Sequence, residues 1–216
     1  ISQLPSDPNG GTNISLSDDD SEQVSTSPAV ILYGESYDSL YICSNGRITF
    51  GSGSNDYTET IGEHFAMPAI AMLWDDLNPS NGGTVLYAQL PDRAVVTFNN
   101  VPEYSNSGSN TFQCEMFYDG MIRVSWLGVD SNDNVVGLSA GNSTPEGFEQ
   151  SDLSELAECG EPDVPGDVNG DGLANVTDLL AIMDAWGPCD NCDADLNDDG
   201  QVNVSDLLEV IGNWSI

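Results

Sequence analysis

Two twelve-residue segments near the C-terminal end constrain the fold of this chain most strongly, because they repeat each other without a gap at a period of 28 residues. They read DVNGDGLANVTD, from Asp167 to Asp178, and DLNDDGQVNVSD, from Asp195 to Asp206. In each segment, side chains that carry oxygen occupy positions 1, 3, 5, 9 and 12, and glycine occupies position 6. Ca²⁺ is bound by about six to eight oxygens on a sharply turning loop. The pattern therefore predicts two Ca²⁺ sites.

The ligands expected at both sites are oxygen atoms only, which favours Ca²⁺ over zinc or copper. Position 7 offers its backbone carbonyl, position 9 binds directly or through water, and Gly172 and Gly200 permit the turns. The expected ligands are Asp167, Asn169, Asp171, Leu173, Asn175 and Asp178 in the first loop, and Asp195, Asn197, Asp199, Gln201, Asn203 and Asp206 in the second. The alternative is a pair of solvated acidic turns that cap helices, but it leaves the gapless repetition unexplained.

Each loop is followed by an apolar pattern of helical period. Leu179, Leu180, Met183 and Trp186 mark the first helix, and Leu207, Leu208, Ile211 and Trp214 mark the second. Helices this short are not stable alone in water. We therefore expect the two Leu/Trp faces to pack against each other as one paired unit.

The charge balance is extreme, with 36 acidic residues against three arginines and no lysine, for a formal net charge of −33. Such a chain repels nucleic acid and anionic lipid, whose phosphates are bound by Lys and Arg. No run approaches the roughly 18 apolar residues of a membrane span. The chain starts at Ile1 without a basic, apolar leader, as an exported and processed protein or a trimmed chain would. We expect a secreted, extracellular protein.

The five cysteines fit an oxidising, extracellular setting. Cys189 and Cys192, in the sequence CDNC, are expected to form a local disulfide. A thioredoxin-like pair would need a βαβ context, and a zinc site would have only Cys159 as a further soft ligand nearby. Cys43 and Cys114 are a candidate second disulfide, which leaves Cys159 as the odd residue.

Short runs of β-forming residues fill the middle of the chain, separated by turn residues at intervals of roughly 8–12 residues, which favours an antiparallel β-sandwich. The turns Ser44-Asn45-Gly46 and Tyr118-Asp119-Gly120 are strong hairpin signals. The runs are AVILY, SLYIC, RITF, AIAMLW, TVLYAQL, AVVTF, TFQCEMFY, MIRVSWLGV and VVGLS. The expected fold is mainly β with a small α module. It comprises an extended N-terminal arm (1–28), the sandwich (29–150), a linker (151–165) and two EF-hand-like loop–helix repeats (166–216).

Two features of the repeats narrow their family. Position 12 is Asp rather than Glu, and Pro162 and Pro165 replace an entering helix. From Gly166 to Trp214 the chain resembles the type I dockerin module. This resemblance implies a module that folds on Ca²⁺ and plugs into a cohesin domain, with either helix able to face the partner. It also implies partner contacts at loop positions 10 and 11, which are Val176, Thr177, Val204 and Ser205. The insert PCDNC is similar to dockerin-type repeats on surface proteins of aquatic bacteria.

The β-rich region also resembles a known family. Its markers are SNGRITFG, WDDLNP and the turn NVPEY, within a stretch of about 110 residues that is similar to the nidogen-like β-sandwich domain of secreted bacterial proteins. The resemblance implies a fold but no shared chemistry, because such domains accompany both enzymes and adhesins.

The sequence favours a protein that is not an enzyme. Gly137-Leu138-Ser139-Ala140-Gly141 matches the nucleophile elbow G-x-S-x-G, but the only histidine, His64, precedes the serine, and a turn-rich loop follows it. His64 is expected to be a surface or packing residue. Asp75 and Asp76 offer a third cation site together with Asp18–Asp20, although a solvated turn explains them as well.

We therefore expect a calcium-binding interaction protein whose C-terminal module attaches the sandwich to a cohesin-like domain or to another copy of itself. One alternative is a self-assembling subunit of a filament or surface layer. Its head-to-tail contacts would use the C-terminal module or the N-terminal arm, where Ile14–Val24 could add to a neighbouring sheet. The other alternative is a glycan-binding adhesin with an aromatic platform drawn from Tyr57, Phe65, Tyr87 and Tyr104.

Overall fold

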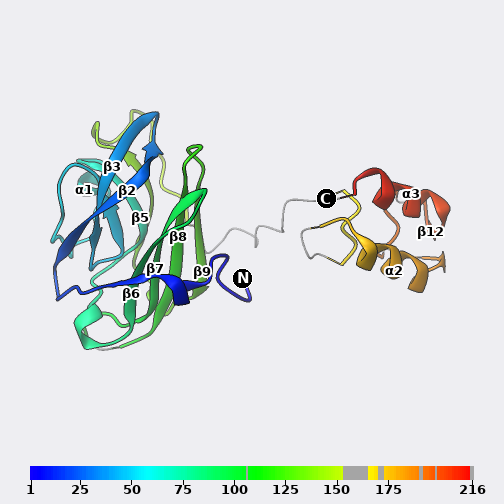
Figure 1. Ribbon diagram of the computed structural model, residues 1–216, viewed down its shortest axis with the longest axis horizontal. Helices are drawn as coiled ribbons and strands as arrows, with labels where there is room; N and C mark the ends of the chain where they lie inside the picture. Colours follow the sequence, from blue (N-terminus) through cyan, green and yellow to red (C-terminus); the bar gives the residue numbers. More distant parts are fainter. Residues whose placement is uncertain (106, 153–164, 170–172, 190–191, 198, 215–216) are drawn as a thin grey trace. The chain divides into compact units, whose positions relative to one another are not determined.

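The chain divides into two compact units, Ile1–Phe148 and Glu149–Ile216 (Figure 1). The computed structural model describes residues 1–105, 107–152, 165–169, 173–189, 192–197 and 199–214. Most of the predicted linker lies outside these ranges, as does Cys159. Within them, no helix is both long and apolar enough to cross a membrane.

The first unit consists of two five-stranded antiparallel sheets (Figure 1). One has the order β1-β6-β7-β8-β9 and the other β10-β5-β4-β3-β2. The strands are β1 (Thr12–Ile14), β2 (Ser21–Leu32), β3 (Glu35–Cys43), β4 (Arg47–Thr49), β5 (Pro68–Trp74), β6 (Thr84–Gln89), β7 (Arg93–Val101), β8 (Asn110–Phe117), β9 (Ile122–Gly128) and β10 (Val135–Ala140). Of three single-turn helices, η1 (Pro8–Gly10) precedes β1, α1 (Ile61–His64) lies between β4 and β5, and η2 (Pro79–Asn81) lies between β5 and β6. The prediction of a mainly β, sandwich-like fold is confirmed, and each predicted apolar run coincides with a strand.

Both sheets contribute to one hydrophobic core. It includes Leu40 and Ile42 from β3, Met72 from β5, and Phe98 and Phe112 from neighbouring strands β7 and β8. The rings of Phe98 and Phe112 stack with their centroids 4.8 Å apart. Alternate residues of the strands point into this layer, which is why the runs are rich in Val, Ile and Phe.

The two predicted hairpin turns are present. Gly46, between β3 and β4, has φ +73°, and Gly120, between β8 and β9, has φ +98°. A Cβ atom at Gly46 would lie 1.9 Å from the carbonyl oxygen of Leu73, so only glycine fits there. At Gly120 the nearest atom to such a Cβ, on Ile31, is 3.6 Å away. Gly120 is therefore required for its backbone conformation and not for space.

Gly120→Ala is expected to lower the free energy of unfolding of the sandwich by about 1 kcal/mol, the cost of a left-handed backbone for a residue with a Cβ. Urea unfolding followed by tryptophan fluorescence measures this change. Gly62→Ala is the matched control, because Gly62 has open space around it and no positive φ. A loss at Gly62 as large as at Gly120 would contradict this account of the turn.

The N-terminal segment is part of the sandwich, so the prediction of an extended arm over residues 1–28 is wrong. β1 pairs with β6, and β2 pairs with β3. Ile14 and Leu16 are buried in the core, and the backbone N–H of Ser6 donates to Oε1 of Gln113 at 2.9 Å. Most residues of this segment are polar and face outward. The sequence pattern of the segment therefore does not reveal that it forms strands of the two sheets.

Among the described cysteines, Cys189 and Cys192 form the predicted disulfide, with Cα atoms 6.0 Å apart. The suggested Cys43–Cys114 disulfide is wrong, because both thiols are free and buried. The two residues lie in different sheets, and Sγ of Cys43 is 3.6 Å from Oγ1 of Thr49. Cys114 belongs to the core, where burial raises the pKa of its thiol.

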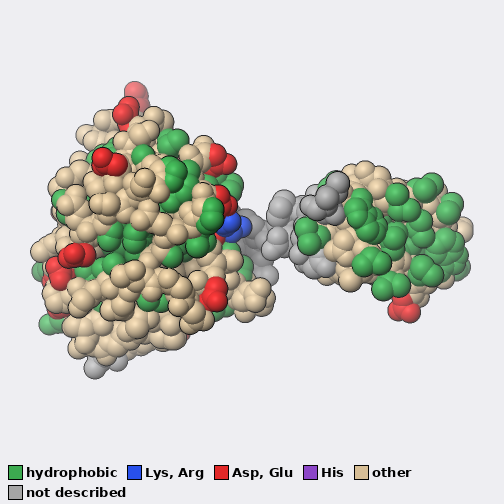
Figure 2. Space-filling view, in the orientation of Figure 1, with side chains coloured by type: hydrophobic (Ala, Val, Ile, Leu, Met, Phe, Trp, Pro, Cys, Tyr) green, Lys and Arg blue, Asp and Glu red, His purple; other side chains and the backbone are tan. Residues whose placement is uncertain are grey.

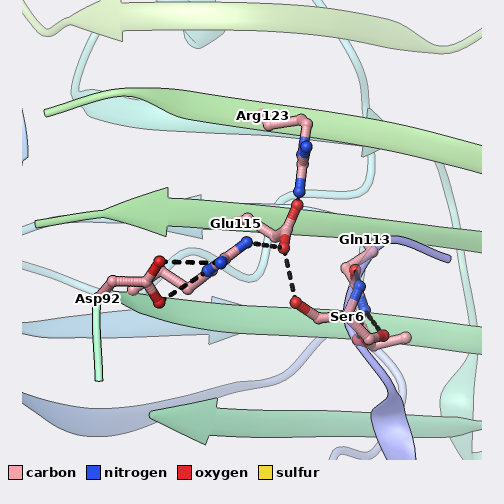
Figure 3. A network of polar contacts seen from close by, with 7 residues as sticks. Ser6, Asp92, Gln113, Glu115 and Arg123 are labelled. Carbon is pink, nitrogen blue, oxygen red and sulfur yellow. Dashed lines mark hydrogen bonds and ion pairs between the residues drawn. The ribbon is translucent and has the colours of Figure 1, made fainter. Parts of the chain in front are cut away.

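A buried carboxylate organises the outer face of the first sheet (Figure 3). Glu115, on β8, is fully buried and accepts hydrogen bonds from Oγ of Ser6 at 2.6 Å, Nη1 of Arg93 at 2.8 Å and Nε of Arg123 at 2.5 Å. Burial raises the pKa of Glu115, but the hydrogen bonds and charges of these partners outweigh it and hold the pKa below its ordinary value. Two of the three arginines in the protein are thus used in one internal network.

The second unit is small. Its elements are α2 (Val176–Asp184), β11 (Gly187–Pro188), β12 (Gln201–Val202) and α3 (Val204–Gly212). β11 and β12 pair antiparallel. Ile182, Ala194, Val202 and Val210 form its buried cluster, with Leu179 and Leu207 packed against them.

Candidate functional site

The last residue of each predicted calcium loop is wholly buried and ties the loop to the helix that follows. Oδ1 of Asp178 accepts from the N–H of Val168 at 3.0 Å, and its Oδ2 accepts from the N–H of Asn175 at 2.8 Å. In the second loop, Asp206 accepts from the N–H groups of Leu196 and Asn203 at 3.0 and 2.8 Å. Each carboxylate therefore joins loop positions 2 and 9, and the two loops close in the same way.

The same residues start the helices. Asn175 and Asn203 are the N-caps of α2 and α3, and each accepts from the N–H two residues later at 2.9 Å. With Asp178 and Asp206 at the third helical position, both helices begin in a complete capping box. The helix-capping alternative is thus realised in the structure. Oδ1 of Asp178 also accepts from the N–H of Asn169 at 3.2 Å. Capping does not exclude a cation, because Oδ2 of Asp178 and both oxygens of Asp206 each accept one hydrogen bond and keep a further lone pair.

The interior of the second loop is folded by its own side chains. Asp195 is buried and accepts from the N–H groups of Asp199 at 3.1 Å and Gly200 at 2.7 Å. Asn197 also accepts from the N–H of Asp199, at 3.0 Å, and Oδ1 of Asp199 accepts from the N–H of Gln201 at 2.9 Å. Side-chain oxygens at positions 1, 3 and 5 are therefore held by the turn of the loop, as Gly200 with φ +82° allows.

The first loop is described at its two ends. Asp167, Asn169, Leu173 and Asn175 are placed, and Nδ2 of Asn169 donates to Oγ1 of Thr177 at 2.7 Å. Asp171 and Gly172 lie outside the described residues. In the second loop, the oxygens of Asp195, Asp199 and Asp206 do not all lie within 4.8 Å of one another. Within the described ranges, the one group of three acidic side chains that meets this distance is Asp18, Asp19 and Asp76.

Apolar side chains gather on the face of the second unit seen in Figure 2, and the exposed ones form two matching stripes, one on each helix. Their members, Val176, Leu180 and Met183 on α2 and Val204, Leu208 and Ile211 on α3, are each between 48 and 61% exposed. Trp186 and Trp214 are exposed as well. The prediction that the Leu/Trp faces pack together holds for Leu179 and Leu207, which pack against the buried cluster shared by the two helices, and is wrong for the other members of those faces. The buried positions are Ile182 and Val210, which lie one turn after the buried carboxylates at the third helical positions.

All four predicted partner contacts are accessible. Val176 and Thr177 open α2, Val204 and Ser205 open α3, and each of the four is exposed. The two valines belong to the apolar stripes. The remaining members of the stripes were not predicted to be surface residues, because their spacing is also that of a buried helix face.

The sandwich does not bring together the residues that suggested chemistry. Ser139 of the G-x-S-x-G match is buried within β10, and irregular chain rather than a helix follows that strand to residue 152. His64 is buried and its ring packs edge-on against Phe65. Burial, together with the charge of Arg47, lowers the pKa of His64.

The four aromatic residues of the adhesin hypothesis divide into two groups. Tyr57 and Tyr104 are exposed. Tyr87 is buried and donates its hydroxyl to the carbonyl of Ser25 at 3.0 Å, while Phe65 packs against Phe148. They do not supply a four-ring platform.

Comparisons with known proteins identify a family for the first unit only. A family model described as NIDO related matches residues 3–153, which end before the paired loops. No curated protein and no solved structure matches the chain.

Proposed function

Because the chain belongs to the NIDO-related family through its first unit, and this fold alone implies no activity, we propose that the function resides in the second unit. The protein is a non-catalytic, extracellular, calcium-binding interaction protein. Its dockerin-like C-terminal unit folds around two Ca²⁺ ions and attaches the β-sandwich to a protein partner.

The loop chemistry supports calcium. The donors in both loops are carboxylate, carboxamide and carbonyl oxygens, which suit a hard cation. Both loops are closed by the same carboxylate bridge between positions 2 and 9, although their residues differ at positions 2, 4, 7, 8 and 11. A bound cation would also offset repulsion among the acidic side chains of each loop. Because the ions would bind the folded loops only, they would stabilise the fold of this unit.

The observation that carries the docking function is the pair of exposed apolar stripes. Large contiguous apolar patches on soluble proteins mark interaction sites. The stripes start with the valines at loop position 10, one of the two positions where the resemblance to dockerins places the partner contacts. A cohesin-like domain is the partner that this arrangement fits, since either of two equivalent helix faces can present the same i, i+4, i+7 apolar set.

Binding of the full chain to a cohesin-like domain, measured by calorimetry with Ca²⁺ and with chelator, tests the proposal. We expect binding with Ca²⁺ only. Leu180→Asp or Leu208→Asp alone should leave binding through the other stripe, whereas the double variant should lose at least about 30-fold in affinity, as expected for buried anchors. Glu209→Ala, an exposed change on α3 outside the stripe, is the control. Full affinity in the double variant would refute the docking role of the stripes.

A second candidate function is self-assembly, which is favoured by the presence of two equivalent stripes on one unit. A second copy of the chain would then cover a stripe. Assembly through a free N-terminal arm is not supported, because β1 and β2 are already paired within the sandwich. Sedimentation of the purified chain with Ca²⁺ distinguishes the two candidates: polymers that the double variant abolishes favour self-assembly, and a monomer favours a separate partner.

A further inference from the structure

Three acidic side chains meet in the sandwich, far along the sequence from the paired loops. Carboxylate oxygens of Asp18, Asp19 and Asp76 all lie within 4.8 Å of one another. Asp18 and Asp19 belong to the segment that passes from β1 in one sheet to β2 in the other, and Asp76 follows β5. We refer to these three residues as the acidic corner.

Hydrogen bonds between loops hold the acidic corner in place. The N–H of Asp20 donates to Oγ of Ser44 at 2.9 Å, and the N–H of Ser44 donates to the carbonyl of Asp20 at 2.8 Å. Asn45 joins both sides: its Nδ2 donates to Oδ1 of Asp19 at 2.9 Å, and its Oδ1 accepts from the N–H of Leu77 at 3.1 Å. The juxtaposition of the carboxylates is therefore built into the fold.

Two buried carboxylate oxygens at this place have no hydrogen-bond partner. One is Oδ1 of Asp18, within the acidic corner. The other is Oδ2 of Asp75, a residue that is only 7% exposed and lies next to Asp76 in the chain. Buried polar atoms are nearly always satisfied in folded proteins, and a bound cation or water would supply the counterpart that no described residue gives these oxygens.

Among the described residues, no basic side chain forms an ion pair with the acidic corner. The chain has three basic residues besides its single histidine. Arg93 and Arg123 bind Glu115, and the guanidinium of Arg47 lies 3.9 Å from the ring centroid of Trp74. Burial and the charges of Asp19, Asp18 and Asp75 accordingly raise the pKa of Asp76.

We propose that the sandwich binds one divalent cation of the Ca²⁺ class between Asp18, Asp19 and Asp76, with Asp75 beside it, independently of the paired loops. Oxygen ligands without sulfur or imidazole suit such a hard cation. The ion would link the connection between β1 and β2, which passes from one sheet to the other, to the segment that follows β5. It is therefore a structural site, distinct from the site of partner attachment.

Counting the Ca²⁺ ions bound by the full chain, by equilibrium dialysis, tests this proposal. The double variant Asp18→Asn/Asp76→Asn should bind one ion fewer than the unaltered chain. Glu35→Gln/Asp38→Asn removes the same charge from exposed positions of β3 and should leave the count unchanged. An unchanged count in the Asp18→Asn/Asp76→Asn variant would overturn the site. If the paired loops bind no Ca²⁺, the unaltered chain should bind one ion and the Asp18→Asn/Asp76→Asn variant none. Failure of the proposed calcium loops is therefore distinguishable from failure of the site in the sandwich.

Thermal unfolding of the sandwich gives a second readout that does not depend on the paired loops. With chelator, the Asp18→Asn/Asp76→Asn variant should unfold at the same or a higher temperature than the unaltered chain, because repulsion is relieved. Addition of Ca²⁺ should raise the midpoint temperature of unfolding of the sandwich in the unaltered chain but not in the variant. Equal gains in both proteins would overturn the proposal.

Discussion

Replacing Glu115 by alanine is expected to lower the free energy of unfolding of the sandwich by about 3 kcal/mol. Loss of one partner from a buried ion pair costs about 3–5 kcal/mol, because the remaining charges are left without compensation. The lower end applies here because the side chains of Arg93 and Arg123 are 22 and 45% exposed and can be partly rehydrated. Urea unfolding monitored by tryptophan fluorescence measures the change.

Two comparisons show whether the network is responsible. Glu115→Gln keeps the shape and an acceptor for Ser6 but removes the charge, so its loss should be smaller than that of the alanine variant. Asp92→Ala removes an exposed partner of Arg93 and should have little effect. In a double-mutant cycle, Arg123→Ala should cost much less in the Glu115→Ala background than in the unaltered chain. Additive losses would argue against a shared network.

Acid should weaken the same network. Because the pKa of Glu115 in the folded protein lies below its unfolded value of about 4.3, its contribution to stability is fully present above that pH. The contribution is lost as the pH falls through the folded pKa. The difference in unfolding free energy between the unaltered chain and Glu115→Gln should therefore shrink between pH 6 and pH 3. A difference that stays constant over this range would contradict the assignment.

Replacing Asp206 by alanine is expected to unfold the C-terminal unit even when Ca²⁺ is saturating. The substitution leaves the N–H groups of Leu196 and Asn203 without their charged acceptor, and hydrogen bonds to charged groups contribute about 1.5–3 kcal/mol each. The cluster of buried apolar residues in this unit is small, so a loss of this size exceeds what its packing can offset. Circular dichroism at 222 nm and amide NMR spectra measure the loss.

Two further variants distinguish the helix-capping role of Asp206 from the proposed Ca²⁺-binding role of its loop. Ser205→Ala changes an exposed neighbour whose backbone N–H still donates to Asn203, and it should leave the unit folded. Asp199→Ala removes an expected ligand that caps no helix, so it should reduce Ca²⁺ affinity while the helices return at higher Ca²⁺. Signals of the sandwich should persist in all three variants, since the sandwich is a compact unit with its own core. A fully helical Asp206→Ala protein would show that the capping box is dispensable.

The sequence predicted the strands of the sandwich well, because each is a run of β-forming residues bounded by turn residues. It did not reveal β1, because only one of the three residues of this strand is apolar. The partner strand β6 also lies some seventy positions later in the chain, where Val85 pairs with Ile14 and Tyr87 with Thr12. Glu115 lies on the polar face of strand β8, together with Thr111 and Gln113. Its burial follows from register, which places Arg123 directly opposite on β9, and a single sequence does not define that register.

The helices of the second unit show a different limit of prediction from sequence, which concerns the choice of the buried face. Apolar residues occur around most of each helix, so their period alone does not select the buried side. The capping residues could have done so: an aspartate at the third helical position that faces its own loop places the residue four positions later, Ile182 or Val210, on the inner side. The exposed stripes then follow as the opposite face.

The placement of the three arginines also determines how one molecule meets another. Since each is committed to a contact inside its own sandwich, two approaching copies present excess negative charge to each other over a range set by the Debye length, about 10 Å at 0.1 M salt. Contact between copies, or with any acidic surface, would thus be opposed at long range and favoured only where apolar stripes touch. The ionic strength of the surroundings would then govern how densely these molecules can be arrayed.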